Sequence, residues 1–388
     1  MKLYLLILIT FFNSVTTLFF SPHPYNISKI NDIQIVSSSI PTQSTEKSNR
    51  FQNSKQHLSL KNTLQELEDQ KKYIKEREKQ RKRNITISFA GDCTIGYDEN
   101  FPYTNSFPFV LEKQMNNYAY FFSKVKPIFE KDDLTLVNLE TTFTAKVKKA
   151  NKKFRFKGDP SYVNILKEGD IEMVNISNNH IYDYLHEGFL ETIDTLKKAD
   201  VLYSGEGYIE YYTVKDITIA SIGYRGWSTN IKPHLAKDIK EAKEKASIVI
   251  VSFHWGNEYT YYPNQTQISL GRFTIDEGAD VVVGHHPHVM QGIEKYKEKY
   301  IVYSLGNFSF GGNKNPRDKD TFIFQNKFTL IDKKIIKSKE NIIPCSLSSV
   351  KDINNYQPDI LKDSEKERVL KRIYKYSRNL KYGITQID

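Results

Sequence analysis

Five short apolar segments recur along the chain, and each ends at a glycine or an asparagine beside a polar side chain. They are rich in β-branched and aliphatic residues and too short for helices. They therefore predict five strands, at residues 85–90, 134–137, 172–176, 248–253 and 281–283.

Longer stretches with helical character lie between several of these strands, at residues 188–199, 236–245 and 267–277. Strands that alternate with helices indicate an α/β fold. The carboxyl ends of parallel strands meet at one edge of such a sheet. We therefore expect the polar side chains at the five strand ends to gather at that edge.

The folded domain is expected to cover residues 84–345. Its apolar pattern begins sharply at residue 84, and two further strand-like segments, at residues 322–331 and 335–336, follow the five strands. Residues 346–388 are expected to form a C-terminal charged helix and tail beyond this domain.

The chain before residue 84 has a different pattern. Residues 1–20 hold one lysine before a mostly apolar run, which is the arrangement of a signal anchor or a signal peptide. We favour the uncleaved anchor, and a buried strand or helix at a domain edge is the remaining alternative. An anchor predicts a single-pass cell-membrane protein with its main domain outside the cytoplasm. Residues 21–60 read as a polar spacer and residues 61–83 as a charged helical stalk.

Lysine and arginine outnumber the acidic residues by 56 to 46, so the formal net charge is +10. The basic residues are concentrated in blocks at residues 71–83 and 146–157 and from residue 362 onward. Such blocks are either solvated faces or surfaces for an anionic polymer or phospholipids. No groove-reading module accompanies them, which argues against nucleic acid as a partner.

The chain has two cysteines, Cys93 and Cys345. Two cysteines cannot build a disulfide framework or a cysteine-based zinc site, and the sequence leaves open whether these two pair. Any metal would therefore be bound by histidine, carboxylate and amide side chains.

The segment Gly284-His285-His286-Pro287-His288 follows the fifth predicted strand. In an extended backbone, His286 and His288 project on the same side. Imidazole is the commonest neutral ligand for zinc, manganese or iron. His285 should point away from this pair, so we expect no role for it in binding.

The other predicted strand ends carry further metal-binding side chains. Asp92 stands at the first, Glu140 at the second, Asn179 and His180 at the third, and His254 at the fourth. Taken singly, these residues also fit strand-end capping, surface ion pairs or a turn with a buried histidine. Their joint occurrence at one expected sheet edge favours a metal site.

Several of these segments resemble the capsule-biosynthesis CapA (PgsA-like) family. The matching motifs are Asn-Asn-His-Ile-Tyr-Asp at 178–183, His-Trp-Gly-Asn-Glu-Tyr at 254–259, and the segments 284–291 and 304–308; Gly91-Asp92 and Asn138-Leu139-Glu140 fit the earlier motifs. The resemblance implies a relative of the calcineurin-like metallophosphatases with a four-layer α/β/β/α sandwich and an N-terminal anchor. It also implies a role in synthesis and export of poly-γ-glutamate capsule.

The resemblance further implies a site for one or two divalent ions, Mn, Zn or Fe. The implied ligands are Asp92 and His288 for the first ion, Asn179, His254 and His286 for the second, and Glu140 as the acid that bridges them.

By the same resemblance, His180 donates a proton to a leaving group and Asp183 orients it. The implied reaction is metal-assisted hydrolysis at a phosphorus or carbonyl centre. Metallophosphatases carry a histidine two residues after the first aspartate, whereas this chain has Thr94 there. The first ion would therefore lack one imidazole, which argues for a single ion or a weakly held second one.

The substrate-binding residues are left open by the sequence. Tyr259, Tyr261 and Tyr262 follow the His254 motif and either line a groove or pack against the sheet edge. An arginine side chain suits carboxylates because it can bind them in a bidentate manner. The basic candidates are Arg155, Lys157, Arg225 and Arg272.

Three functions remain in competition. The first is a membrane-anchored extracytoplasmic hydrolase of the capsule pathway, acting on poly-γ-glutamate or a related intermediate beside capsule synthesis and export membrane proteins. The second is a non-catalytic accessory subunit whose basic surface binds the polyanion. The third is a secreted metal-dependent phosphoesterase.

Overall fold

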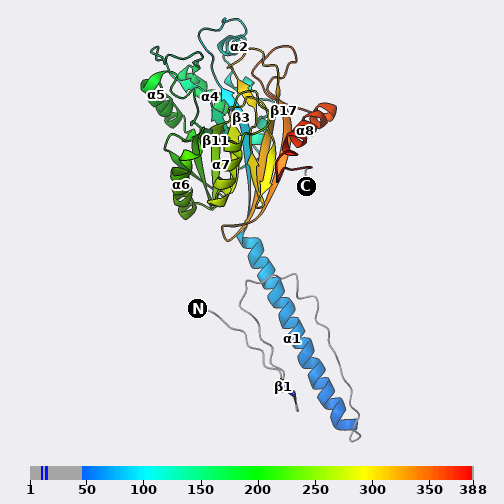
Figure 1. Cartoon of the computed structure of the whole chain (residues 1–388). Coiled ribbons are helices and arrows are strands. Elements are labelled where there is room, and N and C mark those ends of the chain that lie inside the picture. Colours follow the sequence, from blue (N-terminus) through cyan, green and yellow to red (C-terminus); the bar gives the residue numbers. More distant parts are fainter. Residues whose placement is uncertain (1–9, 12–13, 16–45, 387–388) are drawn as a thin grey trace. The chain divides into compact units, whose positions relative to one another are not determined.

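The computed structural model describes residues 10–11, 14–15 and 46–386 of the 388-residue chain (Figure 1). These residues divide into two compact units, one up to Lys71 and one from Lys72 onward. The second unit contains the predicted domain and all of the predicted site residues.

The first unit contains two short strands and most of one long helix. Strand β1 (Thr10–Phe11) pairs antiparallel with β2 (Ser14–Val15), and helix α1 covers Glu46–Arg81. The helix therefore begins within the stretch expected to be a spacer, fifteen residues before the predicted stalk. The rest of the spacer and nearly all of the predicted anchor, residues 1–20, lie outside the described residues.

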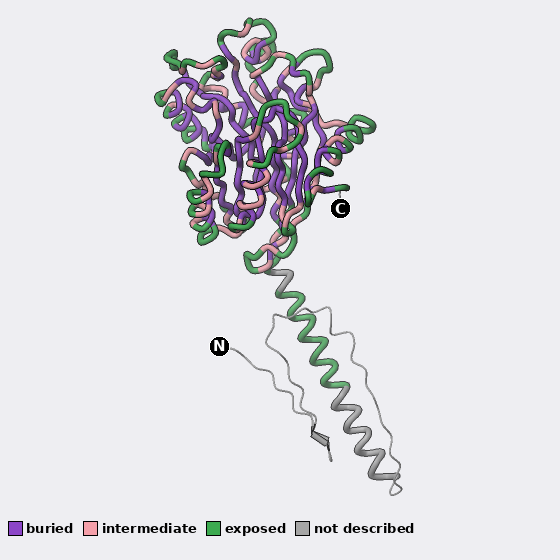
Figure 2. The backbone as a smooth tube through the Cα atoms, viewed as in Figure 1, coloured by how far each residue is buried: buried purple, intermediate pink, exposed green. Residues whose placement is uncertain are grey.

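Helix α1 has no buried face over residues 61–77, whose side chains are all exposed (Figure 2). Its apolar Leu64, Leu67 and Ile74 are 60%, 44% and 50% exposed. These side chains form a thin apolar stripe on a helix that is otherwise mostly polar or charged. No helix among the described residues is long and apolar enough to cross a membrane.

The first sheet of the second unit has the strand order β18-β17-β16-β3-β4-β7-β8, with β15 also paired to β3. Strands β3, β4, β7 and β8 run parallel, and the long hairpin β16–β17 joins β3 antiparallel. The strands are β3 (Lys82–Thr94), β4 (Leu134–Leu139), β7 (Met173–Asn175), β8 (Leu202–Ser204), β15 (Asn307–Phe310), β16 (Asp320–Ile331), β17 (Lys334–Ser346) and β18 (Asp359–Ile360).

The second sheet has the order β13-β14-β12-β11-β10-β9, and its four central strands are parallel. A separate two-stranded pair is formed by β5 (Thr142–Phe143) and β6 (Lys157–Gly158). The strands of the second sheet are β9 (Ile209–Val214), β10 (Ile217–Gly226), β11 (Ile248–Trp255), β12 (Val281–His285), β13 (Ile293–Tyr296) and β14 (Lys299–Val302).

Seven α-helices are described after α1: α2 (Phe107–Lys113), α3 (Lys126–Phe129), α4 (Val163–Glu168), α5 (Leu185–Lys198), α6 (Lys232–Lys245), α7 (Gln265–Asp276) and α8 (Asp363–Ser377). Short 3-10 helices cover Tyr118–Phe121, Pro160–Tyr162 and Thr229–Ile231. Helices α5, α6 and α7 match the three predicted helical stretches.

Alternate residues of the central strands face different cores, which produces four layers. On β3, Ile85, Ile87 and Phe89 join a core between the two sheets, whereas Ala90 and Cys93 join a core beneath α4 and α5. A third core lies between the second sheet and helices α6 and α7. The predicted four-layer α/β/β/α sandwich is therefore confirmed (Figure 1).

The sequence suggests that the domain ends at residue 345, but the structure extends it. Helix α8 contacts β13 and β17, and Val369, Leu370 and Ile373 are buried in the core between the sheets. The C-terminal segment is therefore part of the domain, and its helix covers Asp363–Ser377. Cys93 and Cys345 are both buried and free.

Candidate metal centre

The candidate ligands lie at the carboxyl ends of strands from both sheets. Asp92 is near the end of β3, Glu140 follows β4, and His254 is near the end of β11. His286 and His288 follow β12. All five are buried, with exposed fractions of 8% or less.

Two overlapping groups of these residues have ligand atoms within 4.8 Å of one another. One group is Asp92, Glu140 and His288, and the other is Glu140, His254 and His286. Glu140 is shared, which is the arrangement expected of a bridging acid.

In the first group, His288 faces both carboxylates. Its Nδ1 is 3.4 Å from Oδ2 of Asp92, and its Nε2 is 3.9 Å from Oε1 of Glu140. Thr94, at the position where a histidine is absent, is buried, and its hydroxyl has no hydrogen-bond partner among the described residues. This group thus offers three donor side chains and no second imidazole.

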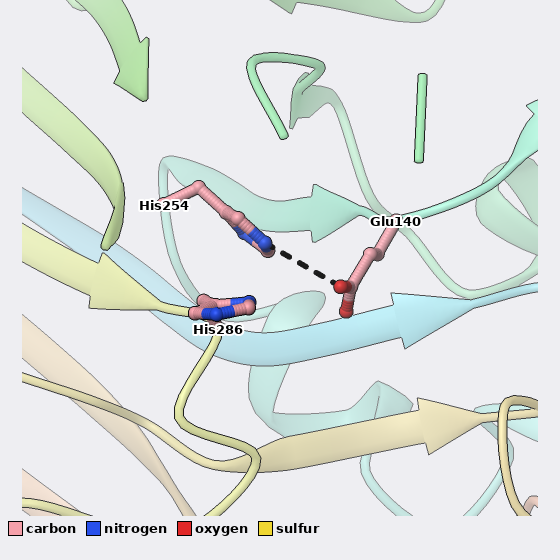
Figure 3. Close-up of side chains that lie close together, drawn as sticks. All are labelled: Glu140, His254 and His286. Carbon is pink, nitrogen blue, oxygen red and sulfur yellow. Dashed lines mark ion pairs between the residues drawn. The ribbon is translucent and has the colours of Figure 1, made fainter. Parts of the chain in front are cut away.

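In the second group, the carboxylate of Glu140 points toward the rings of His254 and His286 (Figure 3). Oε1 of Glu140 is 3.4 Å from Nε2 of His254. The same nitrogen is 2.7 Å from Oδ1 of Asn179, which adds a fourth donor side chain to this group. The second group is therefore richer in donors than the first.

The backbone around the ligands is tightly constrained. A Cβ atom on Gly91 would lie 2.0 Å from the carbonyl oxygen of Gly306, so glycine is required beside Asp92. His286 and His288 have φ angles of 94° and 57°, in the region that favours glycine. Such strain persists only where the surrounding structure enforces it, and it is common at functional sites.

A layer of asparagines orients the ligands. Nδ2 of Asn138 donates to Oδ1 of Asp92 at 2.8 Å and lies 3.2 Å from Nδ1 of His254. Asn175 in turn donates to the side-chain oxygen of Asn138 at 2.8 Å. On the other side, Oδ1 of Asn307 is 2.8 Å from Nδ1 of His288. Such outer contacts fix the orientation of metal-binding side chains.

The unpartnered polar atoms of this region fit a cation. Both carboxylate oxygens of Glu140 and Nδ1 of His286 are buried and have no hydrogen-bond partner among the described residues. A buried carboxylate without a partner is costly, and a divalent ion would compensate it. The donors are oxygen and imidazole nitrogen, which suit manganese, zinc or iron.

Burial also governs ionisation in the site. It raises the pKa of Glu140 well above its ordinary value, and the charge of Asp92 adds to this effect. It lowers the pKa of His254 strongly and that of His286 to about 3, so both rings are neutral. Burial opposes protonation of His288 as well, but the charge of Glu140 and the contacts with Asp92 raise its pKa to about 10. A cation in the first group would therefore displace a proton from His288.

His180 lies beside the two groups, where its ring is oriented by Asp183. Nδ1 of His180 is 2.6 Å from Oδ2 of Asp183, and Lys152 and the backbone N–H of Phe156 also donate to that carboxylate. Nε2 faces the site, 4.0 Å from Oε1 of Glu140. Burial lowers the pKa of His180, and Asp183 opposes this shift. This geometry suits a ring that exchanges a proton at Nε2.

His285 is not as remote as the sequence suggests. It belongs to neither group of potential ligands, but it is fully buried and its Nδ1 is 3.6 Å from Oδ1 of Asp92. Consecutive side chains of a strand do point to opposite faces. Here, however, His286 and His288 follow β12 with positive φ angles, and Asp92 lies close to His285 and His288 alike.

Three of the four basic candidates are held by acids of the chain itself. Lys157 pairs with Glu99, Arg225 with Glu206 and Arg272 with Glu294. In Arg155, by contrast, Nη1 reaches only the carbonyl oxygen of Ala150 at 3.5 Å, and Nε has no hydrogen-bond partner among the described residues.

The three candidate tyrosines differ in their surroundings: two pack against another helix, and one lies beside the site. The rings of Tyr261 and Tyr262 pack on Tyr376 of α8, 5.2 and 5.6 Å away. Tyr259 is 63% exposed, with its ring 6.3 Å from that of His288. Tyr259 alone of the three therefore borders the site.

Two residues at the mouth of the site were not predicted from the sequence. The exposed carboxylate of Glu258 lies within 4.8 Å of ligand atoms of His286 and His288. Trp227, 46% exposed, stands edge-on to His286 and His254 with ring separations of 4.6 and 5.8 Å. In the sequence, Glu258 could have been suspected only from its place four residues after His254. No feature of the sequence pointed to Trp227.

Comparison with known proteins gives consistent matches over this domain. Residues 86–312 match the family described as bacterial capsule synthesis protein PGA_cap. A Bacillus anthracis capsule biosynthesis protein CapA is 30% identical over 329 residues, 76% of each chain. The PGA biosynthesis protein CapA of Bacillus subtilis is 35% identical over 251 residues, which span 58% of this chain and 63% of that protein, less than two thirds of its length.

Two solved structures match the chain at low similarity. A hypothetical protein from Thermus thermophilus gives a TM-score of 0.42 with 14% identity, over 67% of this chain and 99% of that one. A 5'-nucleotidase from Candida albicans gives 0.39 with 11% identity, over 76% and 58%. With TM-scores this low, neither structure informs on function.

Proposed function

Because the chain belongs to the PGA_cap family of bacterial capsule synthesis proteins, we propose that it acts in the synthesis or export of poly-γ-glutamate capsule. The family match covers most of the domain, and the similarity to the Bacillus anthracis CapA protein extends over three quarters of both chains. The proposed partners are the anionic polymer and the membrane proteins that make or export it.

We further propose that the domain binds one or two divalent ions. The observation that carries this proposal is Glu140, a fully buried carboxylate with both oxygens unpartnered, shared by two groups of potential ligands. Asn179, His254 and His286 would bind the tighter ion with Glu140, and Asp92 and His288 the weaker one. A divalent ion bound there would polarise a phosphoryl or carbonyl oxygen of the substrate.

The chain's own residues would perform three tasks around that ion. His180 would transfer a proton at Nε2, with its ring held by Asp183. Lys152 neutralises Asp183 and also donates to the carbonyl oxygen of Asn179, which fixes the loop that carries both site residues. Trp227 would form an apolar wall beside His254 and His286.

The apolar run near the N-terminus supports a location at the cell membrane. Met1-Lys2 followed by an apolar stretch fits a signal anchor, which would leave the domain outside the cytoplasm. Fractionation of cells with protease treatment of the intact surface would test this proposal.

Metal content tests the proposed centre. The purified full chain, saturated with Mn or Zn and then freed of unbound ions, is expected to retain ions. The double variant His254→Ala, His286→Ala should lose them, whereas His234→Ala, a change at an exposed histidine of α6, should not. A wild-type protein that holds no ion under saturating Mn and Zn would refute the metal centre.

A non-catalytic accessory role remains as the second candidate, favoured by Thr94 in place of a ligand histidine. His180→Ala separates the two roles because it removes the proton-transfer group and leaves the proposed metal ligands in place. In a strain that depends on this protein for capsule, loss of capsule with retained metal supports catalysis. Normal capsule with His180→Ala supports the accessory role.

A further inference from the structure

A basic groove lies at the end of the sandwich opposite the candidate metal centre. It has a volume of about 690 Å³, and seven lysines line it against two carboxylates, Asp280 and Glu298. Its lining includes Ser247, Asp280 and Lys299, which stand at the amino ends of β11, β12 and β14. The metal-binding candidates stand at the carboxyl ends of β11 and β12, so the two features are separated by the length of the strands.

The two sheets supply the two walls of this groove. Lys295, Lys297 and Lys299 come from the β13–β14 hairpin of the second sheet. Lys333, Lys334 and Lys337 come from the end of the β16–β17 hairpin of the first sheet. Lysines therefore face the groove from both sides.

Two of the seven lysines are committed to the fold. Lys243 and Lys299 share the buried carboxylate of Asp280, at 3.2 and 3.0 Å, and Asp280 also accepts the backbone N–H of Val249. Lys299 donates in addition to the carbonyl oxygen of Ala279 at 2.6 Å. These contacts fix the loop before β12, so we assign no binding role to these two lysines.

The three lysines of the β16–β17 hairpin are not held by a carboxylate in this way. Among the described residues, no carboxylate lies within ion-pair distance of Lys333, Lys334 or Lys337, and all three are exposed. Asp332, their neighbour, is paired with Arg81 at 3.1 Å. Like charges held close together repel each other and destabilise the folded state, unless an anion compensates them.

The lysines of the opposite wall pair with exposed carboxylates. Lys295 pairs with Glu298, whose side chain is 88% exposed, and Lys297 pairs with Asp276 with both side chains at least 40% exposed. Exposed pairs of this kind contribute little and are readily replaced by a competing anion. Lys297, Lys333, Lys334 and Lys337 can therefore bind a ligand in the groove.

We propose that this groove binds an extended polycarboxylate chain. A concave site with ammonium groups on two facing walls suits a chain that lies between them and presents a carboxylate at each repeat. A phospholipid bilayer presents its head groups as a plane, which fits this concavity less well. The identification of the chain as poly-γ-glutamate rests on the proposed function, whereas the binding of a polycarboxylate does not depend on the metal centre.

The test compares three forms of the purified full chain by fluorescence anisotropy with a labelled poly-γ-glutamate oligomer. The groove variant is Lys333→Gln, Lys334→Gln, Lys337→Gln. The control is Lys366→Gln, Lys371→Gln, Lys375→Gln, which removes the same charge from exposed positions of α8 outside the groove. Thermal unfolding and metal content of each form are measured alongside.

Wild type is expected to bind the oligomer more weakly as salt is raised, and the groove variant to lose roughly tenfold in affinity at low salt. The control variant should bind as wild type does, and a chelator should leave binding unchanged. An equal loss in both variants, or no loss in the groove variant, would overturn the proposal. So would a groove variant that binds the oligomer normally but loses binding to vesicles of anionic phospholipid. A wild type that binds polyglutamate without holding any metal would refute the metal centre and leave the groove intact.

Discussion

The burial of the Glu140 carboxylate is unfavourable for the stability of the folded protein. It is fully buried, neither oxygen has a hydrogen-bond partner among the described residues, and its pKa is raised because burial disfavours the charged form. Glu294 is equally buried, but it is held by two bonds from Arg272 and one from Tyr303. The contrast indicates that Glu140 is kept for a ligand and not for stability.

Glu140→Gln is therefore expected to stabilise the metal-free protein, by roughly 1–3 kcal/mol, because it removes a buried carboxyl group whose oxygens have no hydrogen-bond partner among the described residues. The same change should abolish the rise in melting temperature that Mn or Zn produces in wild type, since both ligand groups contain this residue. Thermal unfolding with and without a chelator measures both effects.

The matched control is Glu294→Gln, which is expected to destabilise the protein because it leaves Arg272 without its charged partner. Metal should still stabilise that variant. The interpretation of Glu140 fails if the two variants behave alike, or if Glu140→Gln responds to metal as wild type does.

Asp132 gives a prediction about pH. Burial raises its pKa from the ordinary value of 3.8 to about 7, although hydrogen bonds from Ser88 and Thr135 oppose the shift. Between about pH 4 and pH 7 the folded protein holds a proton that the unfolded chain has lost, so stability falls as pH rises through this range. Asp132→Asn should remove that fall and make the variant more stable above pH 7, by a few kcal/mol at most at about 1.4 kcal/mol per pKa unit.

Urea unfolding at about pH 5 and about pH 8 checks this prediction. Wild type should lose more stability than Asp132→Asn between the two conditions. A variant with the same pH dependence as wild type would show that Asp132 ionises normally in the folded state.

At the scale of single residues, the sequence indicated the candidate ligands better than their surroundings. Asp92, Glu140 and His254 could be predicted because each stands at a strand end, and strand direction alone brings such ends together. Trp227 could not, because it reaches the site through the path of a loop after β10 that no periodicity specifies. For His285, the alternation rule could not show that its Nδ1 lies 3.6 Å from Oδ1 of Asp92 in the neighbouring sheet.

At the scale of elements, helix α8 is the largest departure from expectation. Its charged sequence suggests a solvated appendage, yet Arg368 and Arg372 form ion pairs with Asp318 and Asp320 at the start of β16. The apolar face of the same helix, formed by Val369, Leu370 and Ile373, packs against the core between the two sheets. The high charge of the segment did not reveal this packing. A few apolar residues at helical spacing are enough to give a charged helix one buried face.

Ile373→Ala is accordingly expected to lower the free energy of unfolding by roughly 2–5 kcal/mol, as for other large-to-small changes in a core. Ile373 is fully buried among residues of both sheets. Lys371→Ala, two residues earlier on the exposed face, should change stability by no more than about 0.5 kcal/mol. Urea unfolding of the two variants measures the difference, and equal small effects would mean that α8 does not support the core.

The two proposed sites lie at opposite ends of the strands. The edge where the parallel strands end brings together carboxylates and histidines from both sheets, because the parallel strands of each run toward that edge. The opposite edge collects the hairpin turns of β13–β14 and β16–β17, whose lysines line the basic groove. The sequence predicted the first edge because parallel strand order determines it. The second depends on which turns of two different sheets lie side by side, and local pattern does not contain that information.

The boundary between the two units at residue 71 leads to a prediction about the stability of the domain. The residues of the three cores all lie in the second unit, and the described side chains of residues 61–71 are exposed. A chain that lacks residues 1–71 is therefore expected to unfold at the same urea concentration as the full chain and to bind the same number of ions. Urea unfolding and metal analysis of the two chains make the comparison. A truncated chain that unfolds at clearly lower urea, or that loses its ions, would show that the first unit helps to hold the domain together. An unchanged midpoint would assign the stability of the sandwich, and of both of its edges, to the residues from Lys72 onward.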